Sequence, residues 1–482
     1  MRSLFPIACT GTVMCALLVG SSCVPSLTQN PAREPKKAVP ASFGASYGPT
    51  NAPTQAENSA QTRWNQFFPD PDLKALIDIA LKGNLELNTR LQEIFIANSE
   101  VMARQGDYMP RLGARVGAGI ERVGEHTSQG RSDAANGVPV NLQGYGIGMA
   151  ASWEVDVWRR LRNSAKAANY RYLASIEGKN FLVTQLVAEI ARSYYELTTL
   201  DNQLDVLKRN IEIQQNALDV VKLQKQAARV TELAVQRFEA EVLKNQSRQY
   251  DFERQRIEAE NRINLLLGRY PQAVPRKSQI LRAPLPTLVK AGIPSQLLES
   301  RPDVRQAELE LAAAKLDVKS AKAAFYPSLT IDASVGYESF NIRHLVATPQ
   351  SLFYNLAGNL TAPLLNRRAI KAQYYAANAR QLQAVFNFER TLLQSFTEVV
   401  NQLATIANLQ KSFDLQAQQV DKLTQSIEVS NVLFQSARAD YMEVLLTRRD
   451  ALEAEMELIE TKNRQKRAMV NLYQALGGGS RS

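Results

Sequence analysis

The 482-residue sequence has few of the residues from which active sites and metal centres are built. It contains two histidines, His126 and His344, and neither has Cys, Asp or Glu at the spacing typical of metal ligands. It also has no phosphate-binding glycine loop, no nucleophile elbow and no CxxC pair. The sequence therefore predicts a protein that is not an enzyme and that holds no cofactor and no metal ion.

Cysteine is equally scarce, and all three cysteines lie at or before Cys23. The first residues resemble an export signal, because Arg2 is followed by an apolar run and then by small residues up to Cys23. Cleavage before Cys23 would leave one cysteine and no internal disulfide. Aromatic residues make up only 7% of the chain, which argues against a large aromatic core. An assembly of chains or a large core must then provide stability.

The chain carries a formal net charge of +10, which can indicate a nucleic-acid partner. Its Lys and Arg residues are, however, spread along predicted helices among Glu and Asp, and they form no platform with aromatic residues. We interpret the charge as solvated helix surface and expect no nucleic-acid partner.

After the export signal, no segment has the run of about eighteen apolar residues that a membrane-spanning helix needs. Four segments instead alternate apolar residues with small or polar ones: Arg111–Val123, Tyr145–Trp158, Leu329–Glu338 and Leu352–Leu364. Each is about as long as a tilted transmembrane strand. Any one of them also fits a half-buried sheet of a soluble protein, but four together behind an export signal favour a membrane barrel.

Helical periodicity precedes and follows these strands. Val304, Leu311 and Val318 recur at helical spacing until Pro327 ends the pattern. Asn163–Ala228 contains no proline, and as one helix it would span about 100 Å. Its apolar residues step by threes and fours, which is coiled-coil spacing, so it needs neighbouring helices.

The sequence also contains an internal repeat. Trp153–Gly268 aligns with Ala362–Gly477 at a constant offset, and most apolar positions of the first segment stay apolar in the second. Upstream, Pro110 aligns with Pro327 at a larger offset, so the first hairpin is longer and its polar Ser128–Asn136 stretch is expected to be an exposed loop. Each half is predicted to fold as helix, strand, loop, strand, long helix, turn and helix.

Several motifs occur in a fixed order: FFPDPDLKALIDIAL, WEVDVWRRLR, GIPSQLLESRPD, RPDVRQAE with KSAKAAFYPSLT, and LYQALGGG. Together they resemble the signatures of bacterial outer-membrane efflux factors, the TolC-like and OprM-like channel proteins, over nearly all of the mature chain. Because open strand edges cannot remain unpaired in lipid, four strands alone cannot close a barrel. The resemblance implies a mainly α fold in which three chains close one twelve-stranded transmembrane β-barrel above a twelve-helix coiled-coil tunnel.

The segment LVGSSC resembles a lipobox, with Gly20 where Leu is usual, and implies a lipid on Cys23; a plain signal peptide is the alternative. We expect the following boundaries: a signal peptide over 1–22, a lipid-anchored disordered tether over 23–62, a first repeat over 63–270 with its hairpin over 111–158, a linker or equatorial segment over 271–298, a second repeat over 299–477 with its hairpin over 328–364, and a tail over 478–482.

The turns between long and short helices are the expected functional ends, because the family's topology places them at the periplasmic tips. Thr231 and Asp440 are candidate N-caps of the returning helices. Ala228 and Ala437 stand where related proteins have glycine. The candidate residues for docking a periplasmic adaptor are Arg229, Thr231, Arg438, Asp440 and Tyr441. Capping and solubility alone are the alternative role for each.

Two acidic residues near the tips, Asp219 and Glu428, are candidates for a constriction. Glu428 occupies the place where some TolC-like proteins carry a constriction aspartate, and Asp219 is its partner in the repeat. In a trimer they would give six carboxylates, which attract cations and disfavour anions. Ordinary exposed acids of a coiled coil are the alternative.

The resemblance implies an outer-membrane exit duct of a tripartite efflux pump, which passively conducts small molecules from periplasm to exterior. Its expected partners are two further copies of itself, outer-membrane lipid, a periplasmic adaptor and an inner-membrane transporter driven by protons. A duct for type I protein secretion is one alternative. A non-conducting, lipid-anchored coiled-coil scaffold is another.

Overall fold

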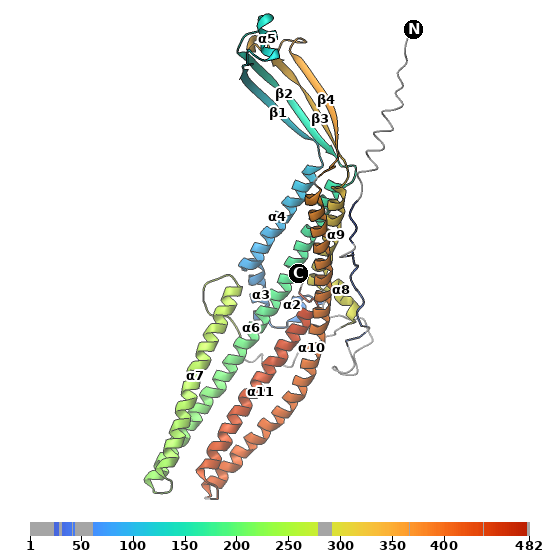
Figure 1. Cartoon of the computed structure of the whole chain (residues 1–482). Coiled ribbons are helices and arrows are strands. Elements are labelled where there is room, and N and C mark those ends of the chain that lie inside the picture. The colour runs from blue at the N-terminus through green and yellow to red at the C-terminus, as the bar shows by residue number, and fades with distance from the viewer. Residues whose placement is uncertain are drawn as a thin grey trace. The chain divides into compact units, whose positions relative to one another are not determined.

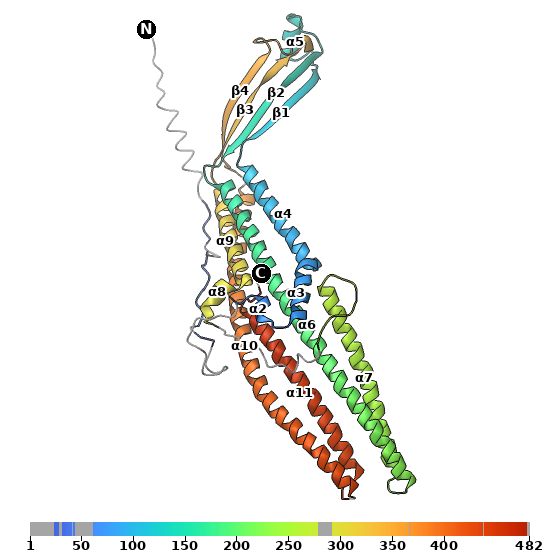
Figure 2. The same cartoon turned by 180° about the vertical axis from the view of Figure 1, so that it is seen from behind.

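The computed structural model describes residues 24–27, 31–40, 42–43, 61–277, 292–365, 367–436 and 438–479. The chain divides into two compact units, each made of separate segments. The sheet unit comprises Met1–Pro35, Ile94–Ala174 and Glu308–Asn387, and the helical unit comprises Lys36–Glu93, Ser175–Ala307 and Phe388–Ser482. Figures 1 and 2 show the helices and strands of both units, coloured along the chain.

The elements follow the predicted alternation of helices and strand pairs. The helices are α2 (Trp64–Phe67), α3 (Pro71–Gly83), α4 (Leu85–Asp107), α5 (Ser128–Ala135), α6 (Arg160–Gln226), α7 (Glu232–Leu266), α8 (Leu297–Ser300), α9 (Pro302–Ala323), α10 (Arg368–Gln435) and α11 (Tyr441–Ala475). The 3-10 turns are η3 (Pro294–Gln296) and η4 (Ile342–His344). The strands are β1 (Arg111–Glu121), β2 (Leu142–Val155), β3 (Ser328–Ser339) and β4 (Leu352–Thr361).

The four predicted strands form one antiparallel sheet in the order β1-β2-β3-β4. In its register, Ile147 of β2 lies opposite Val116 of β1 and Tyr337 of β3, and Tyr337 lies opposite Leu352 of β4. Within this sheet β1 and β4 each pair with one neighbour, so both are edge strands. The polar stretch expected as a loop is instead the short helix α5, because Thr127 caps its first turn by accepting from Gly130 N–H at 3.0 Å.

The predicted long helices are present, and α6 and α10 contain 67 and 68 residues. The returning helices α7 and α11 contain 35 residues each. In the helical unit, apolar residues of α6 such as Tyr194 and Leu197 are fully buried against α3, α7 and α11. In the part of the chain that the structure describes, no helix combines the length and apolar character needed to cross a membrane.

The FFPDPDL motif fixes α3 in the core of the helical unit. Asp70 is the N-cap of α3 and accepts from Asp72 N–H at 2.9 Å. Phe67 stacks on Tyr473 of α11 with ring centroids 4.0 Å apart, and the Tyr473 hydroxyl donates to Thr62 O at 2.6 Å. The motif therefore joins the start of the fold to its last helix.

A joint at the end of α7 holds that helix against the start of α4. Asn84 Nδ2 donates to Leu266 O at 2.8 Å, which satisfies one of the carbonyls left open at the helix end. Gly268 adopts a φ of +69°, and a Cβ atom there would lie 2.2 Å from Gly83 O. Glycine is thus required by both the backbone angle and the close approach.

A second joint at the end of α11 uses Arg301, the first residue of the RPD motif. Its Nη1 donates to Ala475 O at 2.9 Å and to Glu398 Oε2 of α10 at 2.7 Å. Its other nitrogens bind Asp303 in a bidentate pair at 3.0 and 2.7 Å. Gly477 follows with a φ of +91°. The RPD and LGGG motifs are therefore two halves of one contact.

Part of the expected disordered tether makes specific contacts. Lys36 N–H donates to Glu389 Oε1 of α10 at 2.8 Å. Phe43 stacks on Phe396 with ring centroids 5.5 Å apart and is buried. These contacts hold Lys36 and Phe43 on α10, which the polar composition of the segment did not indicate. The expected signal peptide, Cys23, half of the linker and the end of the tail lie outside the described residues.

Gly477→Ala should lower the free energy of unfolding by about 2 kcal/mol or more. A Cβ atom at this φ would lie 2.3 Å from Ser300 O, so the joint would have to open. Gly358→Ala in β4 is the matched control, because its Cβ would meet no atom within 4 Å. Circular dichroism melting of the purified protein measures both. An unchanged melting temperature for Gly477→Ala would contradict the tight joint.

Candidate functional site

The α6–α7 tip ends α6 with a left-handed residue. Ala228 has a φ of +55°, and its N–H donates to Lys225 O at 2.9 Å. The N–H of Arg229 donates to Gln224 O at 2.9 Å. This pair of bonds is the Schellman motif, in which glycine normally occupies the position of Ala228. The tip therefore carries backbone strain that glycine would not have.

The α10–α11 tip has the same outer hydrogen bond. Arg438 N–H donates to Leu433 O at 2.8 Å, and Ser436 N–H donates to Val432 O at 3.0 Å. Ala437 lies outside the described residues. Both tips thus reverse the chain within a few residues and place an arginine directly after the turn.

Thr231 and Asp440 occupy the predicted N-cap positions of α7 and α11, both with extended backbone angles. Their carbonyl oxygens accept from Ala234 N–H and Glu443 N–H, each at 3.1 Å. Their side chains accept no capping hydrogen bond. The position was predicted correctly, but the side-chain oxygens are left for solvent or a partner.

The remaining tip candidates differ in exposure. The side chains of Arg229 and Arg438 are exposed, whereas Tyr441 is half-buried with its ring 6.4 Å from that of Phe238. The nearby Arg237 Nη1 donates to Met442 Sδ at 3.1 Å, so the two helical hairpins touch at this level. The arginines are therefore solvent-exposed, and half-buried Tyr441 also packs one hairpin on the other.

A half-buried cation, Arg448, lies beneath the tips. Arg448 of α11 donates from Nη2 to Asn431 Oδ1 of α10 at 3.2 Å. Burial lowers the pKa of Arg448 from its ordinary value. Apolar residues close the same region, with Leu218, Phe238 and Leu445 in one cluster. The tips therefore adjoin a packed apolar cluster of the helical unit.

The two constriction candidates are both exposed, Asp219 on α6 and Glu428 on α10. Gln215 Nε2 donates to Asp219 Oδ1 at 3.5 Å, one helical turn away. Among the described residues of a single chain, no hydrogen bond or ion pair joins Asp219 to Glu428. One chain alone does not bring them together.

The histidines offer no metal centre. His126 and His344 are both exposed. Over the described residues, no group of three or more His, Cys, Asp or Glu side chains is placed to hold a metal ion.

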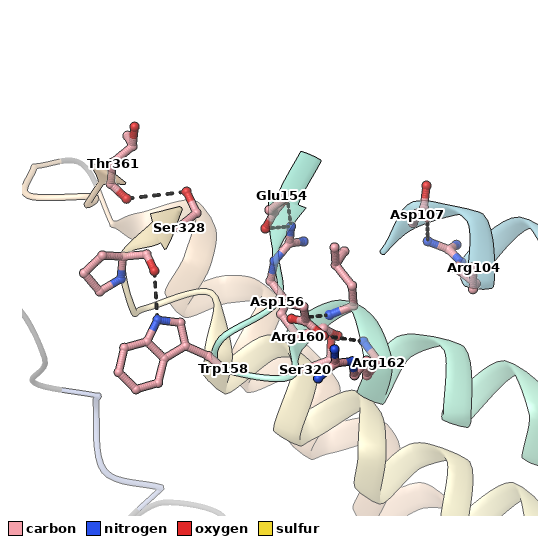
Figure 3. Close-up of polar contacts among 12 residues, drawn as sticks. Arg104, Asp107, Glu154, Asp156, Trp158, Arg160, Arg162, Ser320, Ser328 and Thr361 are labelled. Carbon is pink, nitrogen blue, oxygen red and sulfur yellow. Dashed lines mark hydrogen bonds and ion pairs between the residues drawn. The ribbon is translucent and has the colours of Figure 1, made fainter. Parts of the chain in front are cut away.

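The WEVDVWRRLR motif, to which the sequence alone assigned no role, forms the junction between β2 and α6 (Figure 3). The buried carboxylate of Asp156 accepts from Leu161 N–H at 3.1 Å and from Arg162 N–H at 2.8 Å. It therefore satisfies two open donors and the positive dipole end of α6. Arg160 binds both oxygens of Glu154, at 2.6 and 2.8 Å.

Trp158 holds the other side of this junction (Figure 3). The indole Nε1 of Trp158 donates to Pro327 O at 2.8 Å, and its ring stacks on Tyr326 with centroids 4.8 Å apart. Ser320 Oγ of α9 donates to Arg160 O at 2.9 Å. The FYPS and WEVDVWRRLR motifs are therefore in contact, although they lie far apart in the sequence.

Comparison with known proteins gives consistent results. The family model "Outer membrane efflux protein" matches residues 76–269 and 293–478. The pyoverdine export outer membrane protein OpmQ of Pseudomonas aeruginosa is 27% identical over 424 residues, which cover 87% of this chain and 88% of OpmQ. The probable outer membrane lipoprotein SilC of Salmonella typhimurium is 27% identical over 424 residues, which cover 88% of this chain and 89% of SilC.

A solved structure shares the fold. The crystal structure of CusC, a protein named as a cation efflux system protein in Escherichia coli, has a TM-score of 0.80 and 25% identity. The match covers 93% of this chain and 99% of that chain. The predicted mainly helical fold with four strands and the predicted outer-membrane localisation are thus confirmed.

Ala228→Gly should stabilise the α6–α7 tip by about 1 kcal/mol, because glycine adopts positive φ without the Cβ penalty. Ala240→Gly, at an exposed position inside α7 near the same tip, is the matched control and should cost about 1 kcal/mol. Hydrogen exchange of the tip amides measures both effects. Faster exchange in Ala228→Gly would contradict the left-handed conformation of Ala228.

Proposed function

Since this chain belongs to the outer membrane efflux protein family, we propose that it is the outer-membrane exit duct of a tripartite efflux pump. It conducts small molecules passively from the periplasm to the exterior and carries out no catalytic step. The observation that carries this proposal is an antiparallel sheet with two open edge strands, whose hairpins are each followed by a helix of more than sixty residues. A sheet of this kind needs partners to close.

Open edges in the sheet support assembly into a trimer with one twelve-stranded barrel. The edge strand β1 exposes Val116 by 78% and Ile120 by 71%, and β4 exposes Tyr354 by 83% and Leu356 by 77%. In lipid, unpaired backbone groups of an edge strand are costly, so closure requires further strands. We propose that β4 of each copy pairs with β1 of the next until three copies close the ring.

The helices also expose apolar residues that another copy would cover. Contiguous apolar side chains on a protein surface mark sites of interaction with other proteins or with a membrane. Among the exposed apolar residues of the helices are Leu243 (60%), Leu223 (64%), Leu415 (67%), Leu393 (68%) and Leu265 (75%). The tunnel of the assembled trimer would bury them between hairpins of adjacent copies.

Two equivalent contacts, one in each half of the chain, support the proposed internal repeat. Asn84 donates to Leu266 O, and Arg301 donates to Ala475 O at the corresponding position of the second half. A repeat of this kind lets one chain contribute two similar helical hairpins. Three chains would then supply twelve helices with near-equivalent neighbours.

The lipid anchor and the partners belong to the same proposal. SilC is named a lipoprotein, which supports a covalent lipid on Cys23. This lipid would anchor the chain to the outer membrane. We place a periplasmic adaptor on the exposed tips and an inner-membrane transporter driven by protons beyond it. The tip residues proposed for docking are Arg229, Thr231, Arg438, Asp440 and Tyr441. The names of OpmQ and CusC concern pyoverdine and cations, and both are small cargoes.

The double variant Asp219→Asn with Glu428→Gln should reduce the cation preference of the reconstituted duct by roughly twofold or more, because six carboxylates of the trimer disappear. Reversal potentials in planar bilayers under a salt gradient measure the preference. Glu239→Gln with Asp251→Asn, two exposed acids of α7, is the matched control. Equal selectivity of the unmodified chain, the double variant and the control variant would mean that Asp219 and Glu428 do not form the constriction. No conductance in any of them would contradict the duct itself.

A photo-crosslinking residue at Arg229 or Arg438 should capture a periplasmic adaptor in cells, with a proton-driven exporter copurifying. Both side chains are exposed at the tips, where docking is proposed. Mass spectrometry identifies the captured proteins, and the same residue at Arg254, on the exposed side of α7, is the control. Capture with an ATP-driven transporter would favour protein secretion. Capture only at Arg254 would place the docking surface on the side of the helices.

A further inference from the structure

Both strand-to-helix junctions of the sheet unit expose apolar side chains directly beside arginines. Arg159 lies within the β2–α6 junction, and Arg368 follows the β4–α10 junction as the first residue of α10. Exposed apolar residues at such junctions are unfavourable in water. Four of them occur here: Trp158 (47%), Val157 (56%), Leu364 (61%) and Leu365 (89%). These junctions therefore need an environment that accepts apolar groups and cations together.

The Trp158 side chain is held in a fixed position. Its only donor, Nε1, is already bound to Pro327 O at 2.8 Å, and one ring face stacks on Tyr326. What remains exposed is apolar ring surface without an unmet polar requirement. Tryptophan with a bound polar edge and an exposed apolar body is typical of membrane–water interfaces.

Several arginines near the junctions are neutralised and others are not. Arg160 binds Glu154, and Arg111 binds Asp107 at 3.0 Å. Three exposed arginines have guanidinium groups that make no hydrogen bond or ion pair with any described residue: Arg159, Arg162 and Arg368. Positive charge therefore stays uncompensated beside the apolar side chains.

The backbone at Arg159 adds a further indication. Its φ is +58°, a conformation that favours glycine or asparagine over arginine. The backbone conformation of the turn therefore does not favour arginine at this position, which suggests that the charged side chain itself has a role.

We infer that the two junctions bind phospholipids of the periplasm-facing leaflet of the outer membrane. Trp158, Leu364 and Leu365 contact the glycerol and upper acyl region, and Arg159, Arg162 and Arg368 bind the lipid phosphate. Guanidinium groups bind phosphate oxygens through paired hydrogen bonds, and basic side chains beside a membrane attract anionic lipid. This inference rests on the proposed function, since it requires β1–β4 to lie in the membrane.

The test compares Arg159→Gln with Arg368→Gln against Arg131→Gln with Arg343→Gln. The control pair removes the same charge from exposed arginines in the hairpin loops of the same unit. Each protein is equilibrated with vesicles of equal parts phosphatidylethanolamine and phosphatidylglycerol, then extracted, and native mass spectrometry counts retained phosphatidylglycerol. The junction variant should bind it more weakly by roughly fivefold for each arginine removed. Equal retention in both variants would overturn the proposal.

A spin label at Leu365→Cys identifies what covers the junction. In the same vesicles, the label should be accessible to oxygen and shielded from a water-soluble relaxation agent. Tight immobilisation that is identical in vesicles and detergent would mean that another copy of the chain covers Leu365, which overturns lipid binding. Bilayer conductance of the Arg159→Gln, Arg368→Gln variant separates the two proposals, because a duct that conducts normally remains a duct even when this lipid site fails.

Discussion

The buried guanidinium of Arg301 is the interaction on which the helical unit most depends. This side chain is 4% exposed and connects the start of α9, the middle of α10 and the end of α11. Burial acts to lower the pKa of Arg301, but the hydrogen bond and charge of Asp303, together with the charge of Glu398, outweigh it and raise the pKa. The cation is therefore retained at every physiological pH. A buried pair of this kind is costly to break, because removal of one partner leaves a buried charge unpaired.

Such joints matter because long helices have no globular core of their own. Stability comes from apolar seams along the helices and from fixed helix ends, where open carbonyls must be satisfied. Asn84 and Arg301 meet that requirement by different chemistry, a neutral amide at one end and a charged guanidinium at the other. At the opposite end of the helical unit, the strained Ala228 and exposed Arg229 leave the tip less constrained. This difference between the two ends fits the proposed role of a duct that docks a partner at its tips.

The parts of the fold predicted from the sequence were those set by local periodicity. Alternation located all four strands, and the absence of proline with regular apolar spacing located α6 and α10. The turn positions and the N-cap positions of Thr231 and Asp440 were also predicted correctly. The role of Asp156 could not be predicted, because its carboxylate caps α6 across a turn in which Arg159 adopts a positive φ. Contacts between distant motifs, such as Arg301 with Ala475, leave no periodic signal in the sequence. The RPD and LGGG motifs were recognised, but the contact between them was not predicted.

In the proposed assembly, three copies of this chain close one sheet and one tunnel. Paired cysteines on the two edge strands show whether neighbouring copies pair, starting with Val116→Cys in β1 and Tyr354→Cys in β4 and moving one strand position at a time. Oxidation in membranes should link chains into disulfide-bonded dimers and trimers, and no larger cross-linked species should form. A series that continues beyond three copies, or chains that stay unlinked at every position while native mass spectrometry finds a single copy, would contradict the account.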